Sequence, residues 1–206
     1  RKNQLMFQWL SPSFPTGSFN FSQGLEYAVS QSLVKNEADL VAWIENNLEY
    51  GFLRNDAIFL KLAYQTSTDK DLDDLTELCL AFSCSALKLN EQVMTGDNFA
   101  KASDTQLGLP YPIALGAAAK KHKLNIEELV PLFLQSNISN LIAAAQRLLP
   151  LGHKRSTNIL KNLFKKINEI SRKVLVSGDK DLFSSCYLTD TCTLLHEEFQ
   201  GKVFKS

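Results

Sequence analysis

Apolar side chains recur at helical spacing along almost the whole chain. Val41, Ile44, Leu48 and Phe52 follow one another in steps of three and four residues, the period that covers one face of an α-helix. A longer stripe of the same kind extends over residues 159–175. No long alternation of apolar and polar residues, and no Asn-Gly or Asp-Gly between β-rich segments, indicates a strand. The sequence therefore predicts an all-α fold.

Local signals divide this pattern into separate helices. Asn36 and Thr68 precede helical stripes and are side chains that cap a helix start, the latter with Asp71 in the first turn. Asn125 followed by Glu128 predicts a capping box. Because the breaks are short and no internal repeat is present, we expect one domain over residues 1–206, a bundle of about eight to ten helices.

Several interruptions of the pattern carry further expectations. The polar run at residues 54–56 interrupts an apolar stripe, and Gly178 follows the end of another. A last short helix is predicted to start near Asp190. Gly96 and Gly116 fall inside helical patterns, where glycine costs about 1 kcal/mol relative to alanine. Close packing between helices would explain both glycines.

Composition excludes several classes of partner. Lys and Arg together number 22, and so do Asp and Glu, so the charge balance favours neither nucleic acid nor an anionic membrane. No apolar run approaches the roughly 20 residues of a transmembrane helix. No signal peptide follows Arg1, and we expect native residues before this arginine because the chain does not begin with methionine. Four cysteines without the spacing of a disulfide scaffold or a metal clamp predict buried apolar roles in a reducing cytoplasm: Cys79, Cys84, Cys186 and Cys192.

The chain lacks a recognisable catalytic site. His122, His153 and His196 belong to no metalloprotease, zinc-finger or hydrolase signature, and the glycine-rich nucleotide-binding motifs are absent. Adjacent acidic pairs lie in amphipathic patterns and are expected on solvated faces. The basic run at residues 120–123 is expected to cap a helix end rather than to bind an anion. These absences predict a protein that binds other proteins and is not an enzyme.

Two segments depart from the helical pattern. Residues 11–22 read as a stiff loop, because Pro12 and Pro15 restrict it and Gly17 can adopt a positive φ. The phenylalanines in and around it either fill the core, which we favour, or meet a partner: Phe7, Phe14, Phe19 and Phe21. The tail, residues 197–206, is apolar at Val203 and Phe204, whereas chain ends are usually polar. This tail either packs on its own domain or on a partner, and the residues alone favour neither.

Together the two segments resemble the UreF family, whose pattern opens with S-P-x-x-P-x-G-x-F-x-x-S-x-G-L-E. The matching residues are Ser11, Pro12, Pro15, Gly17, Phe19, Ser22, Gly24, Leu25 and Glu26. The resemblance continues in order through Gly96, Tyr111, Pro112, Ala114, Gly116, residues 146–152, Asp190, His196, Glu197, Phe204 and Ser206. It thus covers essentially the whole chain.

The chain also departs from the family pattern. The family commonly has Gln after P-L-G and a G-Q pair shortly beyond, and near the terminus a Tyr and two Arg. This chain has in their place His153, Ser156, Thr157, Gln200, Lys202 and Lys205. Lysine keeps the charge but lacks the guanidinium fork, so a bidentate contact from the tail loses its basis.

The resemblance implies an all-α cytoplasmic protein that helps to insert nickel into apo-urease. Members dimerise and bind UreD/UreH, and this complex recruits UreG, a GTPase that carries nickel. The family's C-terminal segment docks on UreD/UreH and becomes ordered there. By this resemblance the partner interface is predicted at Pro15, Gly17, Phe19, Ser22, Gly24, Glu26, Gln146, Arg147, Pro150, Gly152, His153, His196, Glu197, Lys202, Phe204, Lys205 and Ser206.

Three functional hypotheses remain open from the sequence. The leading one is a scaffold that regulates UreG, with an arginine finger supplied by Arg54, Arg147, Arg155 or Arg172 as a variant. The second is direct nickel carriage through His153, His196 or a cysteine, although no cofactor is expected to bind tightly and nickel would be held transiently or at an interface. The third, an unrelated helical enzyme, is the least favoured.

Overall fold

Ten α-helices and three short 3₁₀ turns form the computed structural model, which describes residues 1–205 and contains no strand within them. The prediction of an all-α fold with about eight to ten helices is confirmed. The α-helices are α1 (Lys2–Trp9), α2 (Leu25–Ser30), α3 (Glu37–Tyr50), α4 (Phe52–Gln65), α5 (Asp69–Ala81), α6 (Ala86–Ser103), α7 (Tyr111–Lys121), α8 (Ile126–Leu148), α9 (His153–Val176) and α10 (Tyr187–Leu195). The 3₁₀ turns are η1 (Ser18–Asn20), η2 (Asp179–Asp181) and η3 (His196–Glu198).

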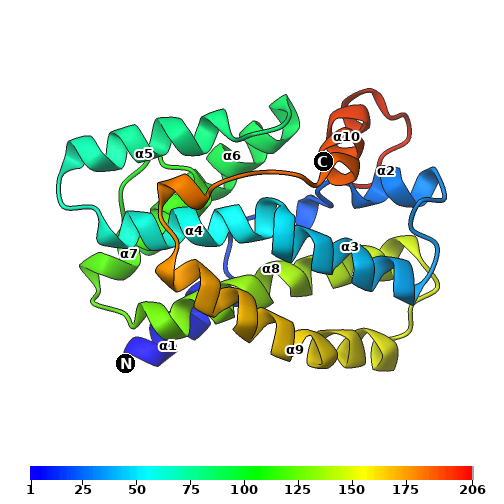
Figure 1. The fold of residues 1–206 in the computed structure, drawn as a ribbon, viewed down its shortest axis with the longest axis horizontal. Helices are drawn as coiled ribbons and strands as arrows, with labels where there is room; N and C mark the ends of the chain where they lie inside the picture. Colours follow the sequence, from blue (N-terminus) through cyan, green and yellow to red (C-terminus); the bar gives the residue numbers. More distant parts are fainter. Residues whose placement is uncertain (206) are drawn as a thin grey trace.

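Helix α4 runs through the middle of the bundle (Figure 1). It packs against α3, α5, α7, α8 and α9. Most of its side chains are buried, among them Leu53, Ile58, Phe59 and Leu60. A helix that is apolar on nearly every side is stable only when other helices surround it. The sequence of α4 therefore explains its central place.

Two helix starts form as their sequences predict. The Asn36 side chain accepts a hydrogen bond from the backbone N–H of Asp39 over 3.0 Å. At α5, Thr68 accepts from the N–H of Asp71, and the Asp71 carboxylate accepts from the N–H of Thr68 in return. Both arrangements satisfy N–H groups that the first helical turn leaves without partners.

Two local predictions need correction. Asn125 caps α8, but its side chain accepts from the N–H of Glu127 and donates to the carboxylate of Glu128, so the reciprocal capping box does not form. The basic run at residues 120–123 lies at a helix end as predicted, with Lys120 and Lys121 in the last turn of α7. The Lys120 side chain differs from the prediction in one respect, because it donates to the carbonyl of Thr66, the C-cap residue of α4.

The helix boundaries also differ from the sequence reading in two places. The polar residues 54–56 lie inside α4, and the break between α3 and α4 falls at Gly51. Helix α10 starts at Tyr187, three residues before the predicted Asp190. Helix α9 ends at Val176, next to Gly178 as predicted.

Gly96 and Gly116 lie at close approaches between helices, as predicted: Gly96 faces the start of α7, and Gly116 faces α4. A Cβ added at Gly96 would overlap the carbonyl oxygen of Leu109 and lie 2.9 Å from the backbone nitrogen of Tyr111. A Cβ at Gly116 would overlap the carbonyl oxygen of Leu60 in α4. At both positions a backbone carbonyl of the neighbouring segment leaves space only for the hydrogen atom of a glycine. A larger side chain would therefore force a helix to move.

The cysteine prediction holds for three of four positions. Cys79, Cys186 and Cys192 are buried, whereas Cys84 is exposed, and all four are free. Burial raises the pKa of Cys186 and of Cys192, each to about 11. The thiols of these two residues are therefore unreactive at neutral pH. Within residues 1–205, no helix combines the length and the apolar character needed to cross a membrane.

Candidate functional site where three segments meet

Three segments far apart in the sequence meet at one end of the bundle: the N-terminal segment (residues 11–26), the α8–α9 turn (residues 146–153) and the tail (residues 197–205). We call this place the junction. Helix α2 packs against both α8 and α10, which brings the segments together. Figure 1 shows α2, α10 and the turn between α8 and α9 on the same side of the molecule.

Glu26, in the first turn of α2, is the centre of the junction. Its side chain is buried, and its carboxylate accepts three hydrogen bonds. Oε1 accepts from the N–H of Val203 over 2.6 Å. Oε2 accepts from the N–H of Phe204 over 3.0 Å and lies 2.8 Å from Nε2 of His196. One carboxylate therefore joins α2, η3 and the tail.

These contacts determine the ionisation of Glu26. Desolvation by burial raises its pKa, but the hydrogen bonds from His196, Val203 and Phe204 and the charge of His196 together lower the pKa below the ordinary 4.5. A carboxyl group with a lowered pKa stabilises the folded state above its ordinary pKa. Glu26 therefore contributes this stability above pH 4.5, and the contribution is lost as the pH falls through the lowered value.

His196 lies wholly inside the junction. Its side chain has no exposed surface, and Nδ1 has no hydrogen-bond partner among the described residues. Through Nε2 the ring joins η3 to the Glu26 carboxylate in α2. His196 is therefore a structural residue of the junction.

A tight turn before α2 aims Glu26 at the tail. Gln23 and Gly24 have φ of 53° and 81°, both in the left-handed region. A Cβ at Gly24 would lie 2.7 Å from Oγ1 and 2.9 Å from the backbone nitrogen of Thr193. Only glycine combines this φ with such a close approach to α10. The turn at Gly24 and the close approach of α10 thus explain the Gly24-Leu25-Glu26 part of the motif.

The tail packs on its own domain with one side and faces outward with the other. Phe204 is buried, and the Arg147 guanidinium lies 4.3 Å from the centre of its ring. Lys205 donates its N–H to the carbonyl of Asn20 over 2.8 Å. Val203, by contrast, is 59% exposed. Of the two alternatives left open by the sequence, docking on the chain's own domain is realised, and an apolar side chain remains available outside.

The α8–α9 turn forms the neighbouring edge of the junction. Nε2 of Gln146 and Nδ1 of His153 lie 3.2 Å apart across the turn. Arg155 donates to the carbonyl of Pro150 over 2.8 Å, which closes the turn. Because Arg147 at the end of α8 also stacks on Phe204, the turn and the tail are physically joined.

The four phenylalanines in and around the N-terminal loop divide between the core and the surface. Phe14 packs against Phe99, with ring centres 5.7 Å apart, and Phe21 is buried. Phe7 and Phe19 are 68% and 64% exposed. The favoured prediction, that the loop fills the core, therefore holds for two of the four rings.

The seventeen predicted interface residues are distributed over three environments. The exposed ones are Pro15, Phe19, Arg147, Pro150, Gly152, His153, Lys202 and Lys205. The half-buried ones are Gly17, Gln146 and Glu197. Those buried inside the junction are Ser22, Gly24, Glu26, His196 and Phe204. Ser206 lies outside the described residues, and the assignment of this set to a partner interface stays a prediction.

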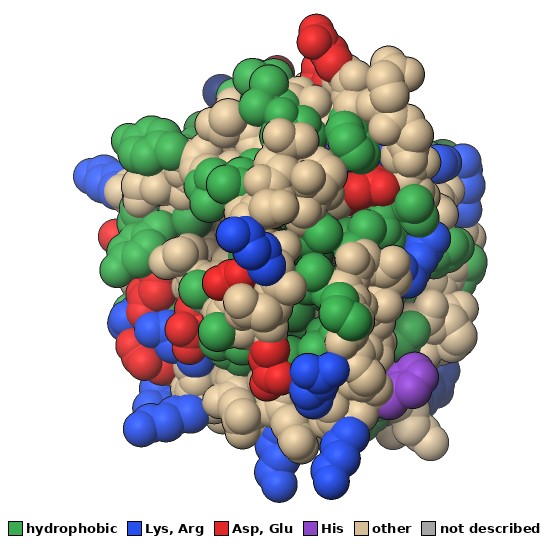
Figure 2. Space-filling view, turned by 90° about the vertical axis from the view of Figure 1, so that its right-hand side faces the viewer, with side chains coloured by type: hydrophobic (Ala, Val, Ile, Leu, Met, Phe, Trp, Pro, Cys, Tyr) green, Lys and Arg blue, Asp and Glu red, His purple; other side chains and the backbone are tan. Residues whose placement is uncertain are grey.

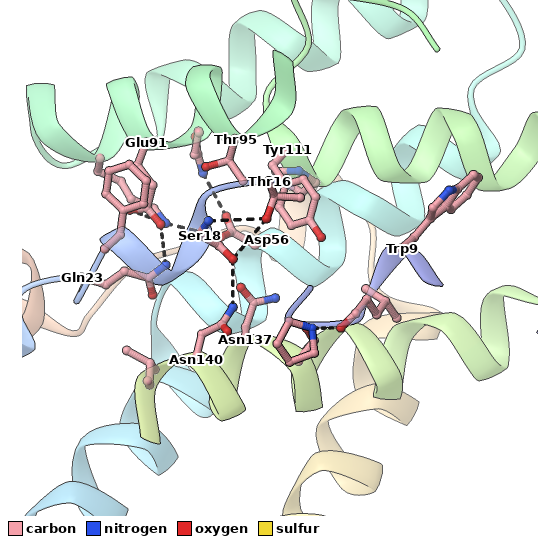
Figure 3. Close-up of a pocket in the computed structure, with 18 of the residues that line it drawn as sticks. Trp9, Thr16, Ser18, Gln23, Asp56, Glu91, Thr95, Tyr111, Asn137 and Asn140 are labelled. Atoms are coloured by element: carbon pink, nitrogen blue, oxygen red, sulfur yellow. Dashed lines mark hydrogen bonds and ion pairs between the residues drawn. The ribbon is translucent and has the colours of Figure 1, made fainter. Parts of the chain in front are cut away.

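A polar pocket that the sequence did not reveal lies beside the junction (Figure 3). The N-terminal segment forms one wall, and side chains from α4, α6, α7 and α8 complete it. Ser18 accepts from the amide of Asn140 over 3.1 Å, and Gln23 donates to Glu91 over 2.7 Å. The Thr95 hydroxyl, which is buried, has no hydrogen-bond partner among the described residues.

Three charged side chains line this pocket. Nζ of Lys88 lies 3.6 Å from Asp56 and 3.8 Å from Glu91, and the three side chains are only 8%, 14% and 9% exposed, respectively. We call them the buried charge cluster. Desolvation raises the pKa of Asp56 although the charge of Lys88 opposes it. For Lys88, desolvation lowers the pKa, but the charges of Glu91 and Asp56 outweigh it and raise the pKa.

The sequence contained a weak signal for this cluster. Asp56 lies three residues after Leu53 and three before Phe59, a spacing that places it on a buried face of α4. Reading residues 54–56 as an interruption concealed this position. Lys88 and Glu91 are three apart, as in a solvated helical ion pair, so their burial in α6 depends on tertiary packing.

The structure also shows the surroundings of the candidate metal ligands and of the four candidate arginine-finger residues. In the described part of the chain, no three His, Cys, Asp or Glu side chains are grouped so as to hold a metal ion. Among the candidate finger residues, Arg54 donates to the carbonyl of Asp181 over 2.6 Å and stacks on Phe183, so it has a structural role. The exposed candidates are Arg147, Arg155 and Arg172.

Named relatives cover nearly the whole length of this chain. The UreF family model matches residues 34–164, more than half of the chain. A protein of Agrobacterium fabrum named urease accessory protein UreF is 35% identical over 211 residues, which cover 98% of this chain and 95% of the relative. Proteins of the same name from Roseobacter denitrificans and Cereibacter sphaeroides are each 34% identical, over 97% and 98% of this chain and 91% and 97% of the relatives. The chain belongs to the UreF family.

Proposed function

We propose that this protein is a non-catalytic urease accessory protein that acts in the cytoplasm as a scaffold for UreD/UreH and UreG during urease maturation. Family membership and the names of full-length relatives support the role in maturation. As the family resemblance implies, the complex contains two copies of this chain and delivers nickel to apo-urease. UreG supplies the nucleotide chemistry.

The observation that carries this proposal is the meeting of three motif-bearing segments at the junction. Figure 2 looks onto this end of the molecule and shows hydrophobic side chains gathered above a lower edge of Lys and Arg side chains. The exposed apolar residues include Phe19 and Val203, and the exposed basic residues include Arg147, Lys202 and Lys205. Apolar anchors with a charged rim are typical of surfaces that bind other proteins.

Deletion of residues 202–206 tests the scaffold role. The deletion removes Phe204 from beneath Arg147 and the N–H donors of the tail from Glu26 and Asn20. We expect the complex with UreD/UreH and UreG to weaken at least tenfold, measured by co-elution at decreasing concentration. Unchanged helical content and a single cooperative unfolding transition of the remaining chain are the control. Undiminished co-elution would show that the tail is not a contact surface.

Regulation of UreG is the finer part of the proposal, with the arginine finger coming from the α8–α9 turn. Arg147 and Arg155 are exposed there, whereas Arg54 is engaged with Asp181 and Phe183. An arginine finger stabilises negative charge in the transition state of GTP hydrolysis. We expect Arg147→Ala or Arg155→Ala to lower GTP turnover in the assembled complex by about tenfold or more, a change of about 1.4 kcal/mol. Arg172→Ala is the matched control, and unaffected rates in both Arg147→Ala and Arg155→Ala would remove the idea.

Nickel enters this proposal as the cargo of the complex. Direct carriage by this chain is the weaker alternative, because His196 is buried against Glu26 and three of the four cysteines are buried. The exposed His153 would then hold nickel only transiently or together with a partner.

A further inference from the structure

The buried charge cluster carries more negative than positive charge. Asp56 and Glu91 are carboxylates, and the ammonium group of Lys88 lies 3.6 and 3.8 Å from them. Lys88 also lies over the Phe52 ring, 4.7 Å from its centre. With all three groups ionised, two negative charges and one positive charge leave the cluster with a net charge of −1. A buried charge that is not balanced is unfavourable, so this cluster attracts a further positive charge.

Three buried oxygen atoms beside the cluster have no hydrogen-bond partner within residues 1–205. They are Oε1 of Gln23, Oε2 of Glu91 and Oγ1 of Thr95. Thr95 is only 3% exposed and Glu91 only 6%. Thr95 follows Glu91 by four residues, so the two side chains lie on the same face of α6. Figure 3 shows the side chains of Gln23, Glu91 and Thr95 at the polar pocket, which all three line. A group that binds among them must therefore be attracted to oxygen.

The size and charge of the pocket restrict what this group can be. The cavity volume is about 40 Å³, above the roughly 10 to 15 Å³ that one water molecule needs, so only a very small group fits. Carboxylate, amide and hydroxyl oxygens are the ligands of hard cations. A single positive charge balances the cluster, whereas a divalent ion would leave an excess of positive charge.

We propose that the pocket binds one monovalent cation of about the size of a water molecule, such as potassium, through oxygens of Asp56, Glu91, Thr95 and Gln23. These ligands come from α4, from α6 and from the turn before α2. Gln23 directly precedes Gly24 in that turn, so the bound cation also fixes how α2 leaves the N-terminal segment. The inference goes beyond the proposed function and does not depend on it.

Thermal unfolding of the full chain in different salts tests the cation site. At equal ionic strength, we expect a higher Tm in potassium chloride than in tetramethylammonium chloride, whose cation is too large for the pocket. At a potassium concentration about ten times the Kd, the difference should be about 3 to 6 °C. Ammonium chloride should act like potassium chloride, because the two ions have the same charge and nearly the same size. An equal Tm in all three salts would overturn the inference.

Variants of the ligands show whether the effect belongs to this pocket. Glu91→Gln removes the unbalanced negative charge, so the difference in Tm between the two salts should disappear. Thr95→Val keeps the shape and every charge but removes one ligand oxygen, and it should reduce the difference by about half or more. This variant remains informative if Glu91→Gln does not fold. Glu45→Gln on α3 and Thr157→Val on α9 make the same changes at exposed positions and should keep the full difference. A full difference in both pocket variants would place the cation elsewhere and contradict the inference.

Two further results would also overturn it. A proton on Asp56 is the other way to balance the cluster, and desolvation raises the pKa of this residue. Stability that does not depend on the salt but is lost as the pH rises through this raised pKa would assign the balance to a proton. A larger rise in Tm with magnesium chloride than with potassium chloride, lost in Glu91→Gln, would assign the pocket to a divalent ion.

Discussion

Gly96→Ala is expected to lower the free energy of unfolding by about 3 kcal/mol or more. In an open helix this change is favourable by about 1 kcal/mol, because alanine has the higher helix propensity. Here the added methyl group would overlap the Leu109 carbonyl and crowd the Tyr111 nitrogen. Both obstacles are backbone atoms, so α6 and the start of α7 must move apart, and overpacking of this kind costs about 1 to 3 kcal/mol or more.

Thermal unfolding with a matched glycine measures this effect. For a domain of this size, about 3 kcal/mol corresponds to a fall in Tm of roughly 6 to 12 °C. Gly178→Ala is the control, because nothing lies within 4 Å of an added Cβ there and φ is −115°. We expect its free energy of unfolding to change by about 0.5 kcal/mol or less, so that Tm changes little. Similar unfolding temperatures for the two variants would mean that α6 and α7 are not in close contact at Gly96.

Lys88→Met is expected to destabilise the protein by about 3 to 5 kcal/mol, the range for breaking a buried ion pair on one side. The change keeps most of the side-chain volume but leaves Asp56 and Glu91 without the cation that lies 3.6 and 3.8 Å from them. Since both carboxylates are largely buried, water cannot replace that charge fully. Packing of the Lys88 ammonium over the Phe52 ring, 4.7 Å from its centre, is lost as well.

Urea unfolding of four variants distinguishes charge from packing: Lys88→Met, Asp56→Asn, the two combined, and Lys173→Met. Lys173→Met removes a lysine that pairs with Glu169 over 2.9 Å and with Glu49 over 3.5 Å. Lys173 and Glu169 are about half exposed and Glu49 keeps its pair with Lys166, so we expect a loss of only about 0.5 to 1 kcal/mol. The double variant Asp56→Asn, Lys88→Met should be less destabilised than the sum of the two single changes, because one unpaired charge is removed. Strict additivity would indicate that Asp56 and Lys88 do not interact.

The local parts of the fold could be predicted because their causes lie within one helical turn. The caps at Asn36 and Thr68 depend on a side chain and an N–H group three residues away. The end of α9 near Gly178 and the helical character of residues 159–175 follow from spacing in the same way. Gly96 indicated a close approach, although its partner, Leu109, could not be predicted from any local pattern.

The errors arose where burial reverses the meaning of a polar residue. Residues 54–56 suggested an interruption of the apolar stripe, yet Asp56 faces the interior and meets Lys88. Lys88 and Glu91 have the spacing of a surface pair, yet α4 and the N-terminal segment cover them. Sequence periodicity shows which residues share a face, but it does not show how many faces of a helix become covered.

By itself, the sequence determined the all-α class, several helix ends and membership of the UreF pattern, because these depend on neighbouring residues and on ordered motifs. Only the tertiary structure decided where the tail lies and what its motif residues do. Glu26 and His196 are 170 positions apart, and their meeting depends on how α2 and α10 pack through Gly24. A hydrogen bond of that range forms only after the bundle has closed. That closure also divides the predicted interface residues into those that hold the junction together and those that remain outside for a partner.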